Sequence, residues 1–386
     1  MTLLARRDAP PAIGDRRRNR PDRVLFMTIF AISLLGLLMI YSATRVGLER
    51  DNLPASFSME RQMIFVAAGL IMFVAVSFFD YRELRHLFPG LYVGMLVLLP
   101  FVFLFPEVNG ARRWINLGFF QLQPSEFSKT VLVIALAAIL GRPVARLSWV
   151  RVFQALGLLA VPSVLIFLQP DLGTMMVFWF VLLVMLFGAG MSGRQLLLLS
   201  GGAAFSATIL FQQGWLFPHQ LNRIRVLLDP SIDPTGIGWN LRQSKLAVGS
   251  GQLFGKGLFE GQQTNFQYVP EQGTDFIFTA LGEQLGFVGA ILLVLAYLVL
   301  IWRLLVISAN SRDRFGALVT LGIAAMFMFH IFINIGMTVG IMPVTGLPLP
   351  FMSAGGSSFL NFSIALGIAN SVWLRRSPVP GENSIL

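Results

Sequence analysis

The sequence predicts an all-α, polytopic membrane protein, and three observations lead to this fold class. Of its 386 residues, 55% are hydrophobic and only 12% are charged, whereas soluble domains carry about 25% charged residues. The mean hydropathy is +0.72. Uncharged apolar stretches recur along the chain, and most approach the roughly 20 residues that cross a bilayer. Together these features exclude a soluble enzyme, a coiled coil and a disordered chain.

Ten membrane-spanning helices are expected from these stretches. In chain order they cover residues 24–44, 62–79, 87–106, 130–141, 152–170, 172–193, 195–222 and 276–302, with two more inside 315–374. The last stretch must be divided, because Pro343, Pro348 and Pro350 interrupt it. The predicted organisation is therefore a tail at 1–23, a ten-helix membrane domain at 24–374 and a tail at 375–386.

The basic residues indicate which side is cytoplasmic. Most of the 29 Lys and Arg residues fall on the side of the two tails, so both termini are expected in the cytoplasm. The net charge of +10 then reflects topology, and the tail at 1–23 is interpreted as a contact with anionic lipid rather than a nucleic-acid-binding arm. The absence of Cys excludes disulfides and thiolate metal sites.

Two outward segments hold the unusual polar residues. Residues 109–129 form one predicted loop, and residues 214–275 form a large extracytoplasmic loop between the seventh and eighth helices. The aromatic residues of the large loop disfavour disorder, so we expect an ordered lid. Its stretch G-S-G-Q-L-F-G-K-G at 249–257 lacks the spacing of a nucleotide-binding P-loop. It is either a flexible turn or a site where glycine amides and Lys256 face an anionic headgroup.

Asp275 lies where the large loop meets the eighth helix. It is either the N-cap of that helix or a general base whose pKa is raised by its apolar neighbours. Glu283 follows eight residues later and should share a helix face with Asp275. A charge inside a membrane span marks a functional site by default, although Glu283 could equally serve as partner to a buried Lys or Arg.

A second group of charges comprises Arg113 (beside Arg112), Glu126, Lys129 and Asp171. These residues either hold a pyrophosphate or pair with one another. A divalent cation, Mg²⁺ or Mn²⁺, is a further candidate, with Glu126 and Asp171 as its ligands. No organic cofactor is expected. The three His residues are scattered, so a transition-metal site is not predicted.

Several motifs, taken in order, resemble one family of bacterial cell-wall proteins. They read G-A-R-R-W-I-N-L-G at 110–118, Q-P-S-E-F-S-K at 123–129, Q-P-D-L-G-T at 169–174, G-S-G-Q-L-F-G-K-G at 249–257, V-P-E-Q-G-T-D-F-I-F at 269–278 and N-I-G-M-T-V-G-I-M-P-V-T-G-L-P-L-P-F-M-S-A-G-G-S-S at 334–358. The family is SEDS (shape, elongation, division and sporulation). The P-V-T-G-L-P-L-P-F part looks more like its elongation branch than its division branch.

The resemblance implies a peptidoglycan glycosyltransferase of the bacterial inner membrane that polymerises lipid II. It also implies ten helices, a class B penicillin-binding protein as transpeptidase partner, and the elongation machinery around both. The family's catalytic aspartate matches Asp275, and its other sensitive polar positions match Arg113, Glu126, Lys129 and Asp171. One departure is Gly273, which stands where the family usually has His, so a role for that histidine is in doubt here.

A second hypothesis is a lipid II flippase. Ten spans, charges inside the membrane and the Pro/Gly interruption at 343–356 suit a transporter. The gathering of polar residues on one outward side favours the enzyme instead.

Overall fold

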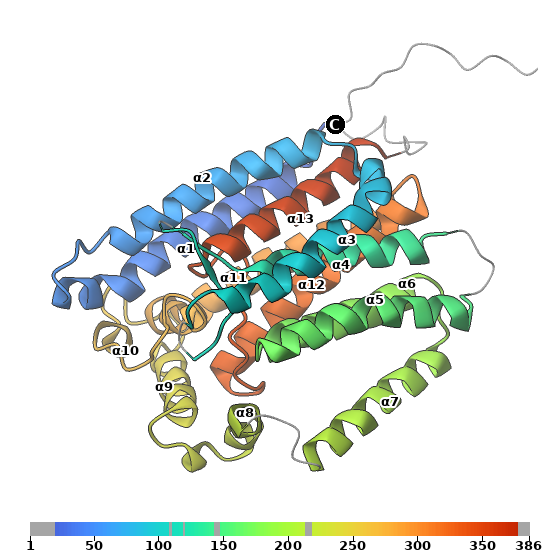
Figure 1. Ribbon diagram of the computed structural model, residues 1–386. Coiled ribbons are helices and arrows are strands. Elements are labelled where there is room, and N and C mark those ends of the chain that lie inside the picture. The colour runs from blue at the N-terminus through green and yellow to red at the C-terminus, as the bar shows by residue number, and fades with distance from the viewer. Residues whose placement is uncertain (1–19, 108–109, 119, 143–146, 213–217, 377–386) are drawn as a thin grey trace, which may run out of the picture.

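The computed structural model describes residues 20–107, 110–118, 120–142, 147–212 and 218–376, so the predicted tails at 1–23 and 375–386 lie almost entirely outside the described residues. The described chain is mostly helical (Figure 1). Its elements are α1 (Arg23–Arg50), α2 (Phe57–Phe78), η1 (Tyr81–Glu83), α3 (Leu84–Phe101), η2 (Val102–Leu104), β1 (Ile115–Asn116), β2 (Gln121–Leu122), α4 (Pro124–Leu140), α5 (Trp149–Leu168), α6 (Leu172–Gly188), α7 (Gly193–Gln212), α8 (Pro218–Leu228), η3 (Pro230–Ile232), α9 (Ile237–Ser250), α10 (Gln262–Asn265), α11 (Ile277–Ala309), α12 (Arg314–Val339) and α13 (Gly356–Leu374).

Seven of the described helices are long and apolar enough to cross a membrane, so the chain is a multi-pass membrane protein. They are α1, α2, α3 with the short turns that flank it, α5, α11, α12 and α13. Helix α6 is equally apolar but shorter. Helices α4, α6 and α7 occupy the positions of the three other predicted spans.

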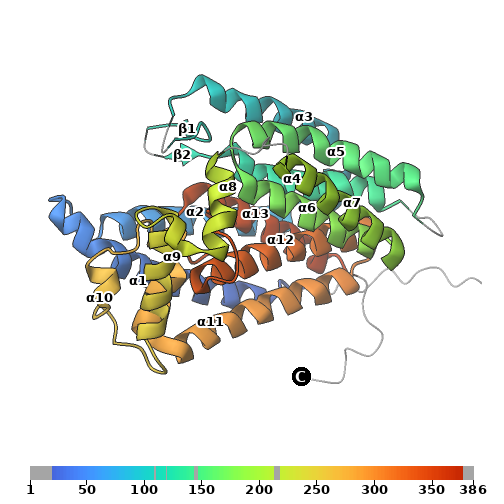
Figure 2. The ribbon, with the colours of Figure 1, turned by 90° about the horizontal axis from the view of Figure 1, so that it is seen from below.

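Helices α12 and α13 form the centre of the bundle, where most of their residues are buried inside the protein. Figures 1 and 2 show α13 lying along α2. Glycines permit this close approach: a Cβ at Gly69 would lie 2.6 Å from the Phe359 ring, and one at Gly367 would lie 2.9 Å from the Phe73 carbonyl oxygen. Small residues commonly bring helices together in this way in membranes.

Helix α11 is broken at Gly286, whose backbone adopts φ 63° and ψ −161°. Its exposed apolar residues begin directly after this break, with Phe287, and continue to Leu305. Before the break, residues 277–284 are buried in the protein. The break also frees backbone groups that need partners, because an unpaired peptide group is costly at the edge of a bilayer.

The glycine-rich stretch at 249–257 supplies those partners. The carbonyl of Gln252 accepts a hydrogen bond from the Phe287 amide at 2.8 Å, and the Lys256 amide donates to the Glu283 carbonyl at 3.0 Å. Only glycine fits at this contact: a Cβ at Gly255, where φ is +80°, would lie 2.1 Å from the Gln284 carbonyl oxygen. The stretch therefore stabilises α11 at its break through backbone hydrogen bonds. The hypothesis that its amides face a headgroup is wrong for the amides of Gly255 and Lys256, because both donate to backbone carbonyls.

Two predicted boundaries differ from the structure. The predicted loop at 109–129 contains the β1–β2 hairpin and then ends early, because α4 begins at Pro124, a residue suited to the first helical position. Glu126 and Lys129 therefore lie on a helix. The predicted span at 195–222 is divided between α7 and α8, and the large loop at 214–275 contains α8, η3, α9 and α10.

Candidate active site

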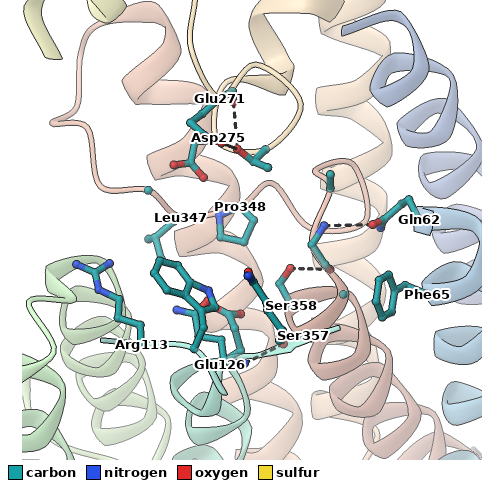
Figure 3. Close-up of a pocket in the computed structure, with 18 of the residues that line it drawn as sticks. Gln62, Phe65, Arg113, Glu126, Glu271, Asp275, Leu347, Pro348, Ser357 and Ser358 are labelled. Atoms are coloured by element: carbon teal, nitrogen blue, oxygen red, sulfur yellow. Dashed lines mark hydrogen bonds between the residues drawn. The ribbon is translucent and has the colours of Figure 1, made fainter. Parts of the chain in front are cut away.

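A cavity of about 710 Å³ lies at the end of the bundle where α4 and α11 begin. Its wall is formed by α2, the β1–β2 hairpin, the first turn of α4, the start of α6, α8, and the segments at 271–275 and 345–358. Figure 3 shows Glu271 beside Asp275, with Arg113 and Glu126 in another part of the same cavity. Segments far apart in the sequence thus bring most of the predicted charged residues together.

Asp275 lies on the cavity wall, just before α11. The N-cap of α11 is Phe276, so the interpretation of Asp275 as an N-cap is wrong. Instead, the backbone carbonyl of Asp275 accepts a hydrogen bond from the buried Asn334 side-chain amide at 2.8 Å. The same amide donates to the carbonyl of Leu347 at 2.8 Å, so α12 fixes two walls of the cavity relative to each other. The Asp275 carboxylate is left free to face the cavity.

Burial, together with the neighbouring charges, sets the pKa of Asp275. Burial and the neighbouring Glu271 carboxylate raise the pKa of Asp275 to about 6, against the opposing effect of the Arg223 and Arg113 guanidiniums. A carboxylate with this pKa is ionised at neutral pH and is still basic enough to accept a proton from a hydroxyl group during reaction.

Arg113 is held by the turn between α5 and α6. Its guanidinium donates to the carbonyl of Gln169 at 2.7 Å and to the carbonyl of Pro170. These two bonds use part of its donor capacity and leave the remaining N–H groups for the cavity that it lines. Arg112 does not line the cavity and is exposed, which resolves the choice between the two neighbouring arginines.

Arg223 is a cavity residue that the sequence reasoning did not identify. It lies on α8, and burial and the charge of Arg113 lower the pKa of its guanidinium. The two arginines therefore repel each other across a partly buried site, an arrangement that an anionic ligand would relieve. The sequence alone does not distinguish Arg223 from the nearby Arg225. The fold does, because α8 places Arg223 on the cavity wall.

Asp171 caps α6 and also lines the cavity. Its carboxylate accepts hydrogen bonds from the Thr174 amide at 3.1 Å, the Thr174 hydroxyl at 2.9 Å and the Ser125 hydroxyl at 3.2 Å. This carboxylate ties the start of α6 to the start of α4. Asp171 is thus a structural cap whose charge also reaches Asp275 and Arg223.

Glu126 and Lys129 form a buried ion pair on α4, with 2.6 Å between Nζ and Oε1. Lys129 lies beneath the cavity rather than on its wall, and its Nζ lies 3.0 Å from Nε2 of the buried His330. His330 in turn bonds the Met326 carbonyl through Nδ1. His330 is therefore the second partner of Lys129.

Lys256 and Glu283 lie outside the cavity and pair with each other at 3.3 Å. Glu283 also accepts hydrogen bonds from the backbone amides of Gln263 and Thr264, both at 2.9 Å. The expectation that Glu283 shares a face with Asp275 is wrong, because Asp275 precedes the helix and Glu283 points toward α10. Of the two interpretations of Glu283, partnership with a Lys is the one that the structure shows.

The carboxylates of the cavity differ in how well they fit a divalent cation. Within the described ranges no group of three or more His, Cys, Asp or Glu residues is arranged to hold a metal ion. However, Oε2 of Glu126 is buried without a hydrogen-bond partner at the cavity wall. Because Mg²⁺ is often bound by one or two carboxylates together with substrate phosphates, Glu126 fits such an ion, and Asp171, already engaged by three donors, fits it less well.

The family model FTSW_RODA_SPOVE, described as "Cell cycle protein", matches residues 22–377. This chain belongs to the SEDS family. It is 36% identical to the probable peptidoglycan glycosyltransferase FtsW of Trichlorobacter lovleyi, over 94% of this chain and 96% of that protein. It is 35% identical to the peptidoglycan glycosyltransferase MrdB of Escherichia coli K12, over 92% and 94%. The SEDS chain is thus an enzyme of the peptidoglycan glycosyltransferase class.

A solved structure supports the fold of this SEDS chain. It is described as "Structural coordination of polymerization and crosslinking by a peptidoglycan synthase complex". The TM-score is 0.77 at 33% identity, and the match covers 92% of this chain and 98% of that one.

Proposed function

We propose that this SEDS protein polymerises lipid II into glycan strands, with Asp275 as the general base. The observation that carries the proposal is the Asp275 carboxylate, with a pKa of about 6, lining one cavity together with the Arg113 and Arg223 guanidiniums. Transfer of a sugar from a lipid pyrophosphate needs both kinds of group: a base for the attacking hydroxyl and cations for the departing pyrophosphate.

The reaction follows from these positions. Asp275 accepts the proton of the acceptor's 4-hydroxyl as that oxygen bonds to the anomeric carbon of the donor. The bond between this carbon and the pyrophosphate oxygen breaks, and the electron pair leaves with the polyprenyl pyrophosphate. Arg113 and Arg223 stabilise the growing negative charge, and no second carboxylate is assigned as nucleophile, so the anomeric configuration should invert.

The other charged residues have positioning roles in this proposal. Asn334 holds the backbone at Asp275, and Lys129, fixed by His330, holds Glu126 at the cavity wall. A divalent cation bound by Glu126 and the pyrophosphate would supply further positive charge to the leaving group. We assign pyrophosphate binding to Arg223 in place of Lys256, which is paired with Glu283.

We further propose ten membrane spans in the bacterial inner membrane, with both termini and most basic residues in the cytoplasm. Supporting this count, α4, α6 and α7 accompany the seven helices of full spanning character. The cavity then faces outward. The P-V-T-G-L-P-L-P-F stretch at 343–351 supports a role in cell elongation as in RodA, with a class B penicillin-binding protein as partner.

The proposal is tested by incubating the purified protein and its cognate transpeptidase with lipid II and Mg²⁺, and by separating the products by size. The wild type should make glycan strands, whereas Asp275→Asn should make none and retain its melting temperature. Asp229→Asn, which alters an exposed carboxylate at the start of η3, serves as the matched control. Strands from Asp275→Asn at the wild-type rate would refute the assignment. If no variant makes strands, transport of lipid II across sealed vesicles tests the flippase hypothesis.

A further inference from the structure

A second cavity, of about 420 Å³, lies at the opposite end of the bundle from the first. Glu126 borders the first cavity and Ile139 borders the second, and both are on α4. Thirteen helical steps of 1.5 Å separate these two residues by roughly 20 Å along the helix axis. The second cavity is therefore remote from the proposed chemistry and needs its own explanation.

Two arginines mark the mouth of the second cavity. Arg142 follows α4, and Arg151 lies in the first turn of α5. Among the described residues neither forms an ion pair, and the guanidinium of Arg151 donates one hydrogen bond, to the carbonyl of Arg142 at 2.9 Å. The intervening residues 143–146 read P-V-A-R and add no acidic group. Most of the guanidinium N–H groups thus remain available to an anion.

The start of α5 adds to this positive potential. The side chain of Ser148, its N-cap, makes no hydrogen bond to the first turn, and the carbonyl of Ser148 accepts one from the Arg151 amide at 3.0 Å. Within the described residues, the first two backbone N–H groups of the helix are therefore open. The N-terminus of a 20-residue helix attracts negative charge, and phosphates frequently bind there. Two guanidiniums that form no ion pair within the described part of the chain lie beside a helix N-terminus at one cavity mouth, and together they favour a phosphate group.

Apart from Gln154, the rest of the cavity is apolar. Phe88, Ile139 and Leu158 line it, and a Cβ placed on Gly157 would meet no atom within 4 Å. Next to the mouth, Phe153 on α5 is 66% exposed, as expected for a side chain that faces lipid. The cavity therefore combines a cationic mouth with an apolar floor that runs about two turns along a membrane-spanning helix.

We propose that this cavity binds an anionic phospholipid, with the phosphate on Arg142 and Arg151 and an acyl chain over Gly157. Basic pockets between spanning helices on the cytoplasmic side are suited to anionic headgroups. The proposal does not depend on the reaction in the first cavity. With the topology proposed above, the bound lipid belongs to the cytoplasmic leaflet.

The test measures phospholipid binding to the purified, delipidated full-length protein by native mass spectrometry. Phosphatidylglycerol is titrated in parallel with phosphatidylcholine. The wild type should bind phosphatidylglycerol more tightly, and the double variant Arg142→Gln/Arg151→Gln should weaken that binding roughly 10- to 30-fold. Arg194→Gln, which removes an exposed basic residue at the start of α7, should leave it unchanged.

A second variant tests the apolar half of the cavity. Gly157→Leu places a side chain in the open space without altering charge, so it should also weaken phosphatidylglycerol binding. Equal binding of the two phospholipids would overturn the proposal. So would loss of binding in the double variant with no effect of Gly157→Leu, because surface charge alone would then explain it. Size-exclusion profiles and melting temperatures establish that each variant is folded.

Discussion

Replacing Glu271 with Gln is expected to extend activity to lower pH. Glu271 raises the pKa of Asp275, which is about 6, and Gln removes the charge while keeping the size of the side chain. A charge interaction of roughly 1 kcal/mol between such neighbours corresponds to about 0.5–1 pKa unit. The base must be ionised to act, so the rate is lost as pH falls through the pKa of Asp275. Lowering that pKa moves the acidic limb downward.

The size of the effect can be worked out from the ionised fraction. With a pKa of about 6, roughly 9% of Asp275 is ionised at pH 5, and a pKa of about 5–5.5 raises this to roughly 25–50%. The variant should therefore be about three- to fivefold faster at pH 5 and unchanged at pH 8.

The assay is kcat/KM for strand formation from lipid II between pH 4.5 and 8.5. Glu260→Gln removes an exposed carboxylate of the same loop and should leave the profile unchanged. Arg223→Gln should move the acidic limb upward, because Arg223 lowers the pKa of Asp275. An acidic limb that stays in place in both cavity variants, or moves in the same direction in both, would show that Asp275 is not the titrating base.

Three further outcomes are expected. Arg223→Ala should raise the KM for lipid II at least tenfold in steady-state assays, whereas Lys256→Ala should leave KM unchanged and lower the melting temperature, because it removes the ion-pair partner of the buried Glu283. Gly255→Ala should destabilise the protein by about 2 kcal/mol or more in thermal unfolding, whereas Gly94→Ala, where a Cβ meets no atom, should be neutral or slightly stabilising. His330→Phe removes the acceptor beside Lys129 and should cost about 1–3 kcal/mol, whereas His330→Gln, which keeps an acceptor, should cost less; equal losses would argue that only the ring packing matters.

Much of the fold could be predicted from the sequence because the bilayer imposes a simple rule. A span needs a long uncharged apolar stretch, and such a stretch can be recognised from the local sequence alone. The start of α4 was missed because Glu126 and Lys129 look like loop residues until their burial as an ion pair is known. A local pattern records charge, whereas burial depends on the helices packed around it.

The candidate site was only partly predictable for the same reason. Asp275 and Arg113 could be identified because they lie within distinctive local motifs. Arg223 lines the cavity only because α8 folds over it. Lys256 does not line the cavity, because it pairs with Glu283, which lies 27 residues later in the chain. Contacts between segments that are distant in the sequence determine whether such residues line the cavity. The spacing of residues within one segment does not predict these contacts.

The break in α11 has a consequence for the height at which the enzyme works. The exposed apolar stripe of α11, from Phe287 to Leu305, is about 27 Å long, close to the thickness of a hydrocarbon core of about 30 Å. The part of α11 before the break at Gly286 is buried in the protein instead of facing lipid, and Asp275 precedes it. The proposed base therefore lies beyond the lipid-facing length of the helix, at the border of the bilayer.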